Sequence, residues 1–399
     1  MKPLFLICCM VLAVMASEDQ KALETLLHDG NNKFTTNMFK EVAKANPDKS
    51  MVISAFSVLT PLAQLALASV GESHDQLLDA IGMPNDNVTK EVFSLANTRV
   101  RSIKDVILKQ ASKIYVAKGF ELNTDFASVT KQTFDSEVQN IDFTLSQSAA
   151  NEMNTWVEQQ TNNRIKDLVD PDNLNSDTRA VLLNAIYFKG EWEAKFDKEL
   201  TRERDFHVNN KITKKVPMMY RRGDYKYGES AELNSLILSM PYKGGETSLV
   251  IVLPNEIEGI VQLKEKLNDP KVLDNALANL YEREVDVYLP KFKIETTTDL
   301  KDILKKMHVD NMFSAQKARL NNLLKNMEDN LYIDSATQKA FIEVNEEGAE
   351  AGAANVFYIH TESLSLDPEL PPKFYADRPF YFAVRYNSSP LFNGVMYAN

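Results

Sequence analysis

Apolar residues recur at intervals of three and four along the first half of the chain, which is the spacing of helices that pack against a core. Phe34, Met38 and Val42, for example, share one helical face. Helices are predicted at residues 31–45, 60–70 and 149–168. The second of these is apolar on nearly all sides, so we expect it to be buried. A short strand at residues 51–54 precedes it and leads into Ser57 at the helix start.

Continuous apolar runs dominate the second half. The run at residues 180–188 is interrupted by only one polar residue, Asn184, and we expect a central strand that is buried on both faces. Further strands are predicted at residues 249–253, 284–290, 339–344, 380–384 and 391–397. Because helices come early and strands late, in separate runs, the chain is predicted to have an α+β fold with a large, mainly antiparallel sheet.

The first 16 residues have the pattern of a secretory signal peptide. Lys2 supplies a positive charge, the apolar run at residues 4–14 is too short to span a bilayer, and Ala16 places a small residue before Ser17. A buried N-terminal helix is the alternative, but no periodic polar face interrupts the run. We therefore expect an extracellular protein in a haemolymph-like fluid, with cleavage before Ser17.

Composition is consistent with one large domain at residues 17–399. The chain has 399 residues, 44% of them hydrophobic, and no linker, repeat or low-complexity tract divides it. Its two cysteines, Cys8 and Cys9, both lie in the predicted signal peptide. The mature chain would then lack disulfides, catalytic thiols and thiolate metal sites, and its stability must come from burial.

Little in the sequence suggests an enzyme or a nucleic-acid-binding protein. The formal net charge is −11, and the basic spots are short, which disfavours binding to nucleic acid or heparin. None of the common catalytic or nucleotide-binding motifs occurs. The five histidines are scattered without metal-ligand spacing. We expect no catalytic residues, no metal and no cofactor. Asn87 and Asn387 begin candidate glycosylation sequons, the second weakened by Pro390.

The most distinctive stretch is at residues 346–354, where six of nine residues are Gly or Ala. The stretch comprises Glu346, Glu347, Gly348, Ala349, Glu350, Ala351, Gly352, Ala353 and Ala354. It has weak β-propensity, and it also lacks the Pro, Asn, Asp and Ser of ordinary loops. From Ala349 onward, alternate residues are apolar except Asn355, while the other face carries Glu350 and His360. The stretch therefore fits both a half-buried strand and an exposed loop, which indicates either a switch or a plain edge strand followed by a loop.

Several longer motifs resemble the serpin family. The matching segments are residues 181–192, 341–348, 377–382 and 390–394. The resemblance extends from about residue 34 to residue 399. Residues 289–295 and 346–351 are especially similar to moth serpins of the antitrypsin/antichymotrypsin type. It implies a single domain with about eight or nine helices and an exposed reactive loop at about residues 346–373, with residues 346–354 as its hinge.

The resemblance also implies a mechanism and a set of structural residues. A target protease would cleave the loop, form an acyl-enzyme and be trapped when the loop inserts into the large sheet. Trp192 matches the family's breach position, and Ser54, Ser57 and Asn184 match its shutter. Gln338 stands where a histidine is common; glutamine can donate and accept hydrogen bonds but does not titrate. The expected partner is a protease, and the protein is expected to be a monomer that binds neither nucleic acid nor membrane.

Family spacing from Gly348 places the scissile bond between Glu362 and Ser363. Glu362 favours a serine protease that prefers glutamate; slippage would present Leu364, Leu366 or Asp367 instead. Cysteine proteases also form acyl-enzymes, so they stay an alternative target class. A non-inhibitory binding or storage protein and a secreted hydrolase are the competing functions. The unobstructed hinge argues against the first, and the missing motifs argue against the second.

The bond assignment predicts the mass of a single fragment. Incubation with the target protease should release a C-terminal peptide that begins at Ser363, because cleavage separates it from Glu362. Mass spectrometry of the incubation mixture measures this directly. A fragment with any other first residue would show that the assigned bond is wrong.

Overall fold

The computed structural model describes the backbone of residues 2–326, 330–348 and 370–398, and the side chains of these residues from position 18 onward. This part of the chain contains nine α-helices and fourteen strands. The helices are α1 (Lys2–Ala45), α2 (Ala55–Ala68), α3 (Glu72–Ile81), α4 (Asp86–Ser102), α5 (Thr124–Phe134), α6 (Ser146–Gln160), α7 (Ile260–Lys266), α8 (Val272–Ala278) and α9 (Leu300–Lys306).

The larger sheet has nine strands, and all but one of its strand pairs are antiparallel, as the sequence predicts. Its order is β1-β14-β13-β8-β7-β6-β9-β12, with β5 paired to β6. The strands are β1 (Met51–Ile53), β5 (Arg202–His207), β6 (Thr213–Ser230), β7 (Ser235–Pro241), β8 (Thr247–Pro254), β9 (Tyr281–Pro290), β12 (Lys373–Tyr375), β13 (Phe380–Tyr386) and β14 (Ser389–Met396).

The second sheet has five strands in the order β10-β11-β4-β2-β3. These strands are β2 (Val106–Ala117), β3 (Glu137–Ile141), β4 (Ala180–Gly190), β10 (Phe292–Asp299) and β11 (Ser335–Val344). The outer pair β10/β11 and the pair β4/β2 are antiparallel, whereas β11/β4 and β2/β3 are parallel. The centre of this sheet is therefore a parallel pair.

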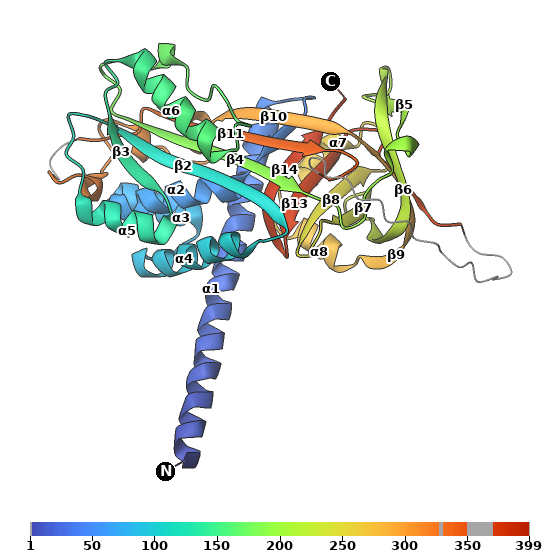
Figure 1. Ribbon diagram of the computed structural model, residues 1–399, viewed down its shortest axis with the longest axis horizontal. Helices are drawn as coiled ribbons and strands as arrows, with labels where there is room; N and C mark the ends of the chain where they lie inside the picture. The colour runs from blue at the N-terminus through green and yellow to red at the C-terminus, as the bar shows by residue number, and fades with distance from the viewer. Residues whose placement is uncertain (1, 327–329, 349–369, 399) are drawn as a thin grey trace.

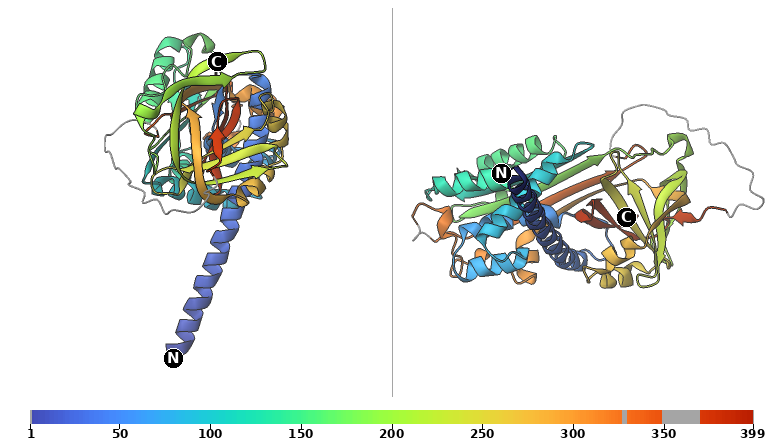
Figure 2. Two further views of the ribbon diagram at one scale, coloured as in Figure 1. Left: turned by 90° about the vertical axis from the view of Figure 1, so that its right-hand side faces the viewer. Right: turned by 90° about the horizontal axis from the view of Figure 1, so that it is seen from below.

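Both faces of the five-stranded sheet are covered (Figure 1). Helix α6 lies on one face, and α2 and α5 lie on the other. Alternate residues of β4 point to the two sides: Tyr187 packs near Phe341 under α6, while Phe188 contacts Phe392 of the nine-stranded sheet. The end-on and bottom views show the two sheets stacked against each other (Figure 2). The predicted double burial of β4 is confirmed, because its residues are buried except for Lys189.

The predicted helices exist, but their bounds differ. The buried helix starts at Ala55 rather than residue 60, because the Ser54 hydroxyl caps it by accepting the backbone N–H of Ser57 at 3.2 Å. Helix α6 ends at Gln160. The prediction that the helix continues through residues 161–168 is therefore wrong. Asn162 follows with a φ of 53°, in the left-handed region where a helix cannot continue.

Helix α1 begins at Lys2, well before the predicted residue 31, and continues to Ala45 without a break. Among the described residues, no helix is both long and apolar enough to cross a bilayer. Cleavage before Ser17 stays a prediction.

Gly394 allows the close approach of β14 to β1, so replacing it should destabilise the fold. A Cβ atom at Gly394 would lie 2.2 Å from the carbonyl oxygen of Met51 and 2.6 Å from the ring of Phe382. We expect Gly394→Ala to lower the free energy of unfolding by about 1–3 kcal/mol, since the backbone must shift to relieve the clash. Urea unfolding followed by circular dichroism measures the loss.

Gly119→Ala is the matched control, because no atom lies within 4 Å of a Cβ at Gly119. Its effect should stay within about 0.5 kcal/mol of wild type. Equal unfolding midpoints for the two variants would contradict the steric argument.

Candidate functional site

The site lies between β4 and β11, the central parallel strands. Their register pairs Ser335 with Val181 and Phe341 with Tyr187. Beyond Tyr187 the pairing between them stops, although β11 continues to Val344 and β4 to Gly190. The strands are thus joined over most of their length and separate at their C-terminal ends. Hinge residues follow directly from the open end of β11.

A tight turn at residues 345–348 closes this open end. The backbone N–H of Trp192 donates to the carbonyl of Glu347 at 3.0 Å, and that of Phe196 donates to the carbonyl of Glu346 at 2.9 Å. The first residues of the hinge are therefore held by the segment that follows β4. Gly348 forms one antiparallel bridge with Glu191, which follows β4, and another with Asn345, which follows β11, so the turn lies at the mouth of the gap between the two strand ends.

Gly348 is required by the shape of this turn. Its φ of 110° lies in the left-handed region, and a Cβ there would be 2.2 Å from the carbonyl oxygen of Gly190 and 2.6 Å from the amide of Trp192. No other residue fits without moving the backbone. The sequence interpretation of this stretch, that it lacks bulk in order to fit a tight place, applies to Gly348 in the observed turn.

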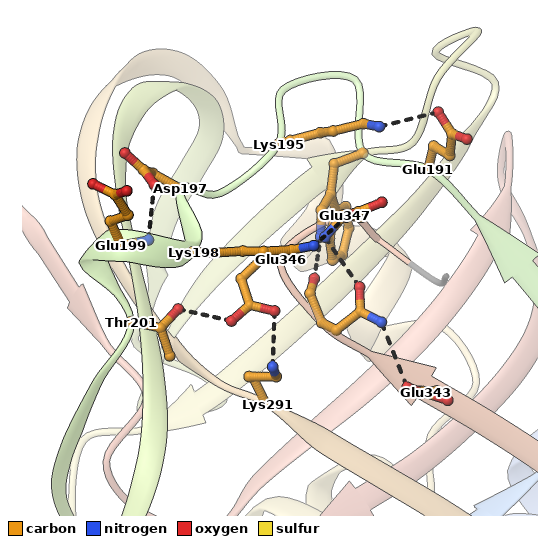
Figure 3. A network of polar contacts seen from close by, with 12 residues as sticks. Glu191, Lys195, Asp197, Lys198, Glu199, Thr201, Lys291, Glu343, Glu346 and Glu347 are labelled. Carbon is orange, nitrogen blue, oxygen red and sulfur yellow. Dashed lines mark hydrogen bonds and ion pairs between the residues drawn. The ribbon is translucent and has the colours of Figure 1, made fainter. Parts of the chain in front are cut away.

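Buried electrostatic contacts fix the same turn (Figure 3). The carboxylate of Glu346 is 2.9 Å from the ammonium of Lys291 and accepts a 2.9 Å hydrogen bond from the Thr201 hydroxyl. Its side chain is only 6% exposed. Burial alone would raise the pKa of Glu346, but the hydrogen bonds from Lys291 and Thr201 outweigh it and the pKa is lowered. The neighbouring Glu347 forms an ion pair with Lys198 nearer the surface.

The side chain of Trp192 lies against the turn at residues 345–348. Its indole stacks on Tyr242 with ring centres 4.5 Å apart and planes 5° from parallel. Phe196 contacts it edge-on at 6.2 Å. The indole N–H donates to the carbonyl of Asn345 at 2.8 Å. The aromatic cluster thus holds the first residue after β11 by a side-chain hydrogen bond.

A second polar cluster lies in the middle of the β4/β11 pair, where the chain is fully buried. Gln338 of β11 is in register with Asn184 of β4, and its amide nitrogen is 2.8 Å from the Asn184 side-chain oxygen. The same nitrogen is 2.7 Å from the carbonyl of Ser54, whose backbone N–H donates to the Gln338 side-chain oxygen at 3.2 Å. Ser57 donates its hydroxyl to Asn184 at 2.7 Å. All four residues have 0% exposure.

The structure therefore brings Ser54, Ser57, Asn184 and Gln338 together in one network. Because buried polar groups are costly when unpaired, the network favours the β4/β11 pairing and opposes its separation. Gln338 occupies the middle of the network as donor and acceptor. None of the four side chains changes charge between pH 5 and 8.

Other predicted residues lie outside the described part of the chain or on its surface. Ala349–Ala354 of the hinge and the bond Glu362–Ser363 lie outside the described residues. Asn87 is exposed in the first turn of α4, and Asn387 is exposed in the turn between β13 and β14 with a φ of 50°. Among the described residues, no group of three or more His, Cys, Asp or Glu could hold a metal ion.

Lys291 and Thr201 were missed by sequence reasoning. They come from β-strand ends distant in the chain, and no spacing rule connects them to Glu346. A signal did exist for Lys291, because it lies in the motif at residues 289–295 that resembles moth serpins. Its role as the partner of a buried carboxylate became apparent only from the folded chain.

The two sheets and the site between β4 and β11 have the architecture of a serpin. The crystal structure of Serpin48 from the insect Tenebrio molitor matches with a TM-score of 0.83 and 34% identity, covering 92% of this chain and 96% of that one.

The chain belongs to the serpin family: the family model "Serpin (serine protease inhibitor)" matches residues 29–398. Alaserpin of Manduca sexta is 56% identical over 389 residues, 98% of each chain. Antitrypsin of Bombyx mori is 53% identical over 390 residues, again 98% of each. The resemblance to moth serpins is thereby confirmed.

The Glu346 contacts predict a pH-dependent contribution to stability. Because the pKa of Glu346 is lowered on folding, its stabilisation is present above the carboxyl's ordinary pKa of 4.5 and is lost as the pH falls through the lower folded value. We expect Glu346→Gln to cost about 1–3 kcal/mol at pH 7 and much less below pH 4. Urea unfolding at pH 7, 5 and 3.5 measures the difference.

Glu121→Gln serves as the control, because Glu121 forms an ion pair with Lys325 in which both side chains are 69% exposed. That variant should lose less than about 1 kcal/mol at every pH. A loss for Glu346→Gln that does not change with pH would contradict the assigned carboxylate contacts.

Proposed function

We propose that the protein is a secreted suicide-substrate inhibitor of serine proteases, which it traps as acyl-enzymes by inserting its reactive loop. The observation that carries this proposal is the parallel pair at the centre of the five-stranded sheet, from whose open end the hinge leaves. Membership of the serpin family and the names of its close relatives support the inhibitory function. The signal-like N-terminus supports secretion.

The strand order favours insertion between β4 and β11. A segment that leaves the end of β11 and folds back must run antiparallel to β11, and therefore also to β4. Insertion would replace one parallel pair with two antiparallel pairs, which are slightly more stable per residue. β4 has 11 residues, so residues 349–359 would suffice to pair along its length. About ten new backbone hydrogen bonds at ~1 kcal/mol each would contribute on the order of 10 kcal/mol.

Trapping depends on a race between insertion and hydrolysis. The protease serine oxygen attacks the carbonyl carbon of Glu362, the bond to the Ser363 nitrogen breaks, and Ser363 leaves as an amine that takes the serine proton. The enzyme stays linked to Glu362 as an ester until water attacks. Insertion must carry the ester away first. Cysteine proteases would form the corresponding thioester, so they remain the second target class.

Small hinge residues speed this insertion. Ala349, Ala351 and Ala353 alternate along the sequence, so they would face the interior together when residues 349–359 form a strand. Methyl groups cost little to bury, whereas a charge at these positions would have no partner. The same observation disfavours a non-inhibitory storage or binding protein.

The two polar clusters would set the barrier to insertion. The network of Gln338 with Asn184 and Ser54 must break where the strands part, and the contacts of Glu346 must break where the hinge enters. Each set of contacts stabilises the uncleaved state but is lost in the open state through which the loop inserts. We propose that they prevent insertion before cleavage while leaving it fast enough afterwards.

Glu362 would decide which proteases are trapped, since the residue before the bond occupies the specificity pocket. A glutamate requires a basic pocket. Asn87 and Asn387 are proposed as glycosylation sites because both are exposed, and a role in innate immunity is proposed from the class of protein. A monomer is sufficient for every step.

The trapping mechanism predicts opposite outcomes for adjacent substitutions. Ala353→Glu should place a charge on the inserting face, slow insertion and let hydrolysis win, so that the variant is cleaved but forms at least ~10-fold less complex. Ala354→Glu should stay close to wild type, because residue 354 lies on the other face of the strand, where the wild-type hinge already carries Glu350. Denaturing electrophoresis after incubation with a panel of serine and cysteine proteases measures complex and cleaved inhibitor.

Wild type should give a denaturant-resistant complex of summed mass with at least one protease, and cleavage of its loop should raise the melting temperature. Cleaved inhibitor alone with every protease, or no rise in melting temperature, would refute the trapping mechanism.

A further inference from the structure

A cavity of about 450 Å³ lies between α1, the start of α2, the C-terminal end of α4 and the turn that joins β13 to β14. Its volume is that of a small-molecule site, since such cavities usually measure about 300–1,000 Å³. Every residue that lines it lies after Ser17, so removal of the predicted signal peptide would leave its lining complete.

Much of the cavity wall is apolar. Leu27 of α1, Phe56 of α2 and Leu391 of β14 are buried at the wall, and Val100 and Ile103 at the end of α4 are half-buried there. Leu27 belongs to one of the hydrophobic clusters of the core, whereas Phe56 and Leu391 belong to another. The cavity is therefore a gap where two parts of the core meet, and an apolar ligand in it would contact both.

One cation of the lining has no partner. Arg99 forms an ion pair with Glu24, the acidic residue of the lining. His28 lies 3.3 Å from the carboxylate of Asp274 on α8. Lys21 also lines the cavity and is exposed, and no carboxylate of the described chain lies within ion-pair distance of its ammonium group. The lining thus has one positive charge available for a ligand.

Two acidic residues precede Lys21 on α1 without lining the cavity. Asp19 is two residues away and therefore points to a different side of the helix. Glu18 is three residues away on the same side, but it is exposed and forms no ion pair with Lys21 within the described residues. Exposed pairs of this kind contribute little. A carboxylate inside the cavity can therefore pair with Lys21 without displacing an existing partner.

The apolar wall is continuous with the buried network that holds β4 to β11. Phe56 lies between Ser54 and Ser57 at the start of α2. The Ser54 hydroxyl donates to the backbone carbonyl of Leu391 at 2.6 Å. A ligand that packs against Phe56 and Leu391 therefore supports the positions that the two serines take while the strand pair is closed.

We propose that the carboxylate pocket, defined as Lys21, Leu27, Phe56, Arg99, Val100 and Leu391, binds a small aliphatic carboxylate. The hydrocarbon chain fills the gap between the two hydrophobic clusters, and the carboxylate pairs with Lys21. The bound ligand stabilises the closed β4/β11 pair and slows loop insertion. This consequence rests on the proposed function, whereas the binding itself does not.

Titration calorimetry with decanoate tests the site and its chemistry. Decanoate should bind saturably to a single site, with a dissociation constant on the order of 10–100 μM. Hexanoate has four fewer CH₂ groups to bury and should bind at least ~10-fold more weakly. Decylammonium has the same chain and the opposite charge, and it should also bind at least ~10-fold more weakly. Absence of saturable decanoate binding would refute the pocket.

Two variants locate the ligand, each with a matched control. Lys21→Gln should weaken decanoate binding by about 5-fold without weakening that of decylammonium, while Lys40→Gln changes an exposed lysine of α1 outside the cavity and should have no effect. Equal affinities for these two variants would refute the role of Lys21.

Val100→Phe should fill the cavity and abolish binding. Its control is Val129→Phe, which makes the same change at an exposed position of α5 and should bind decanoate as wild type does. Unfolding midpoints that agree between the variant and its control establish that the fold is intact. Wild-type affinity in folded Val100→Phe would place the ligand elsewhere and overturn the proposal.

The link to the strand pair is tested by comparing two forms of the protein. A ligand that opposes insertion must bind the inserted form more weakly, because coupling between two equilibria is reciprocal. Decanoate should therefore bind the uncleaved protein at least ~3-fold more tightly than protein whose loop has been cleaved. Equal affinities for the two forms would refute the coupling.

These outcomes separate the pocket from the function on which its regulation rests. If wild type traps no protease and loop cleavage does not raise the melting temperature, the proposed function fails while decanoate binding stands. If wild type traps a protease but decanoate does not bind, only the pocket is refuted.

Discussion

The parallel pairing of β4 with β11 governs the architecture around it. Two parallel strands at the centre of a sheet need a long connection, and here residues 191–334 make it, with strands β5 to β9 of the nine-stranded sheet, strand β10 and helices α7 to α9. Both strands are buried on two faces, so nothing but another strand can approach their edges. A chain segment that leaves β11 and turns back finds both edges in the antiparallel orientation. The possibility of inserting a strand follows from this one pairing.

Two different physical interactions hold the pair closed. In the middle, a buried hydrogen-bond network around Gln338 makes separation costly, because Asn184 and Ser54 would lose partners away from water. At the open end, Glu346 is held by one charged and one neutral donor, and Gly348 follows a backbone path that only glycine allows. The first interaction resists opening, and the second holds the start of the hinge at the mouth of the gap. The proposed loop insertion has to overcome both interactions.

The sequence predicted the fold class and the double burial of β4, and the resemblance to serpins implied which residues would form the central network. The first two predictions are confirmed, because the burial pattern of an element can be recognised from residues that are neighbours along the chain. Helix bounds failed where a local signal was overlooked, as with the Ser54 cap of α2 and the left-handed Asn162 after α6. Lys291 and Thr201 could not be found from the sequence, because each meets Glu346 only after distant strands have been brought together.

The family resemblance implied which residues would meet in the sheet, and sequence alone established that residues 346–354 lack bulk and lead into a polar, proline-rich segment. Composition and periodicity are local properties, and they are sufficient for such statements. The folded chain was needed to show that Gly348 sits in a tight turn and that Glu346 is buried against Lys291. Those facts depend on which strands become neighbours, and strand pairing is decided by the packing of the whole domain.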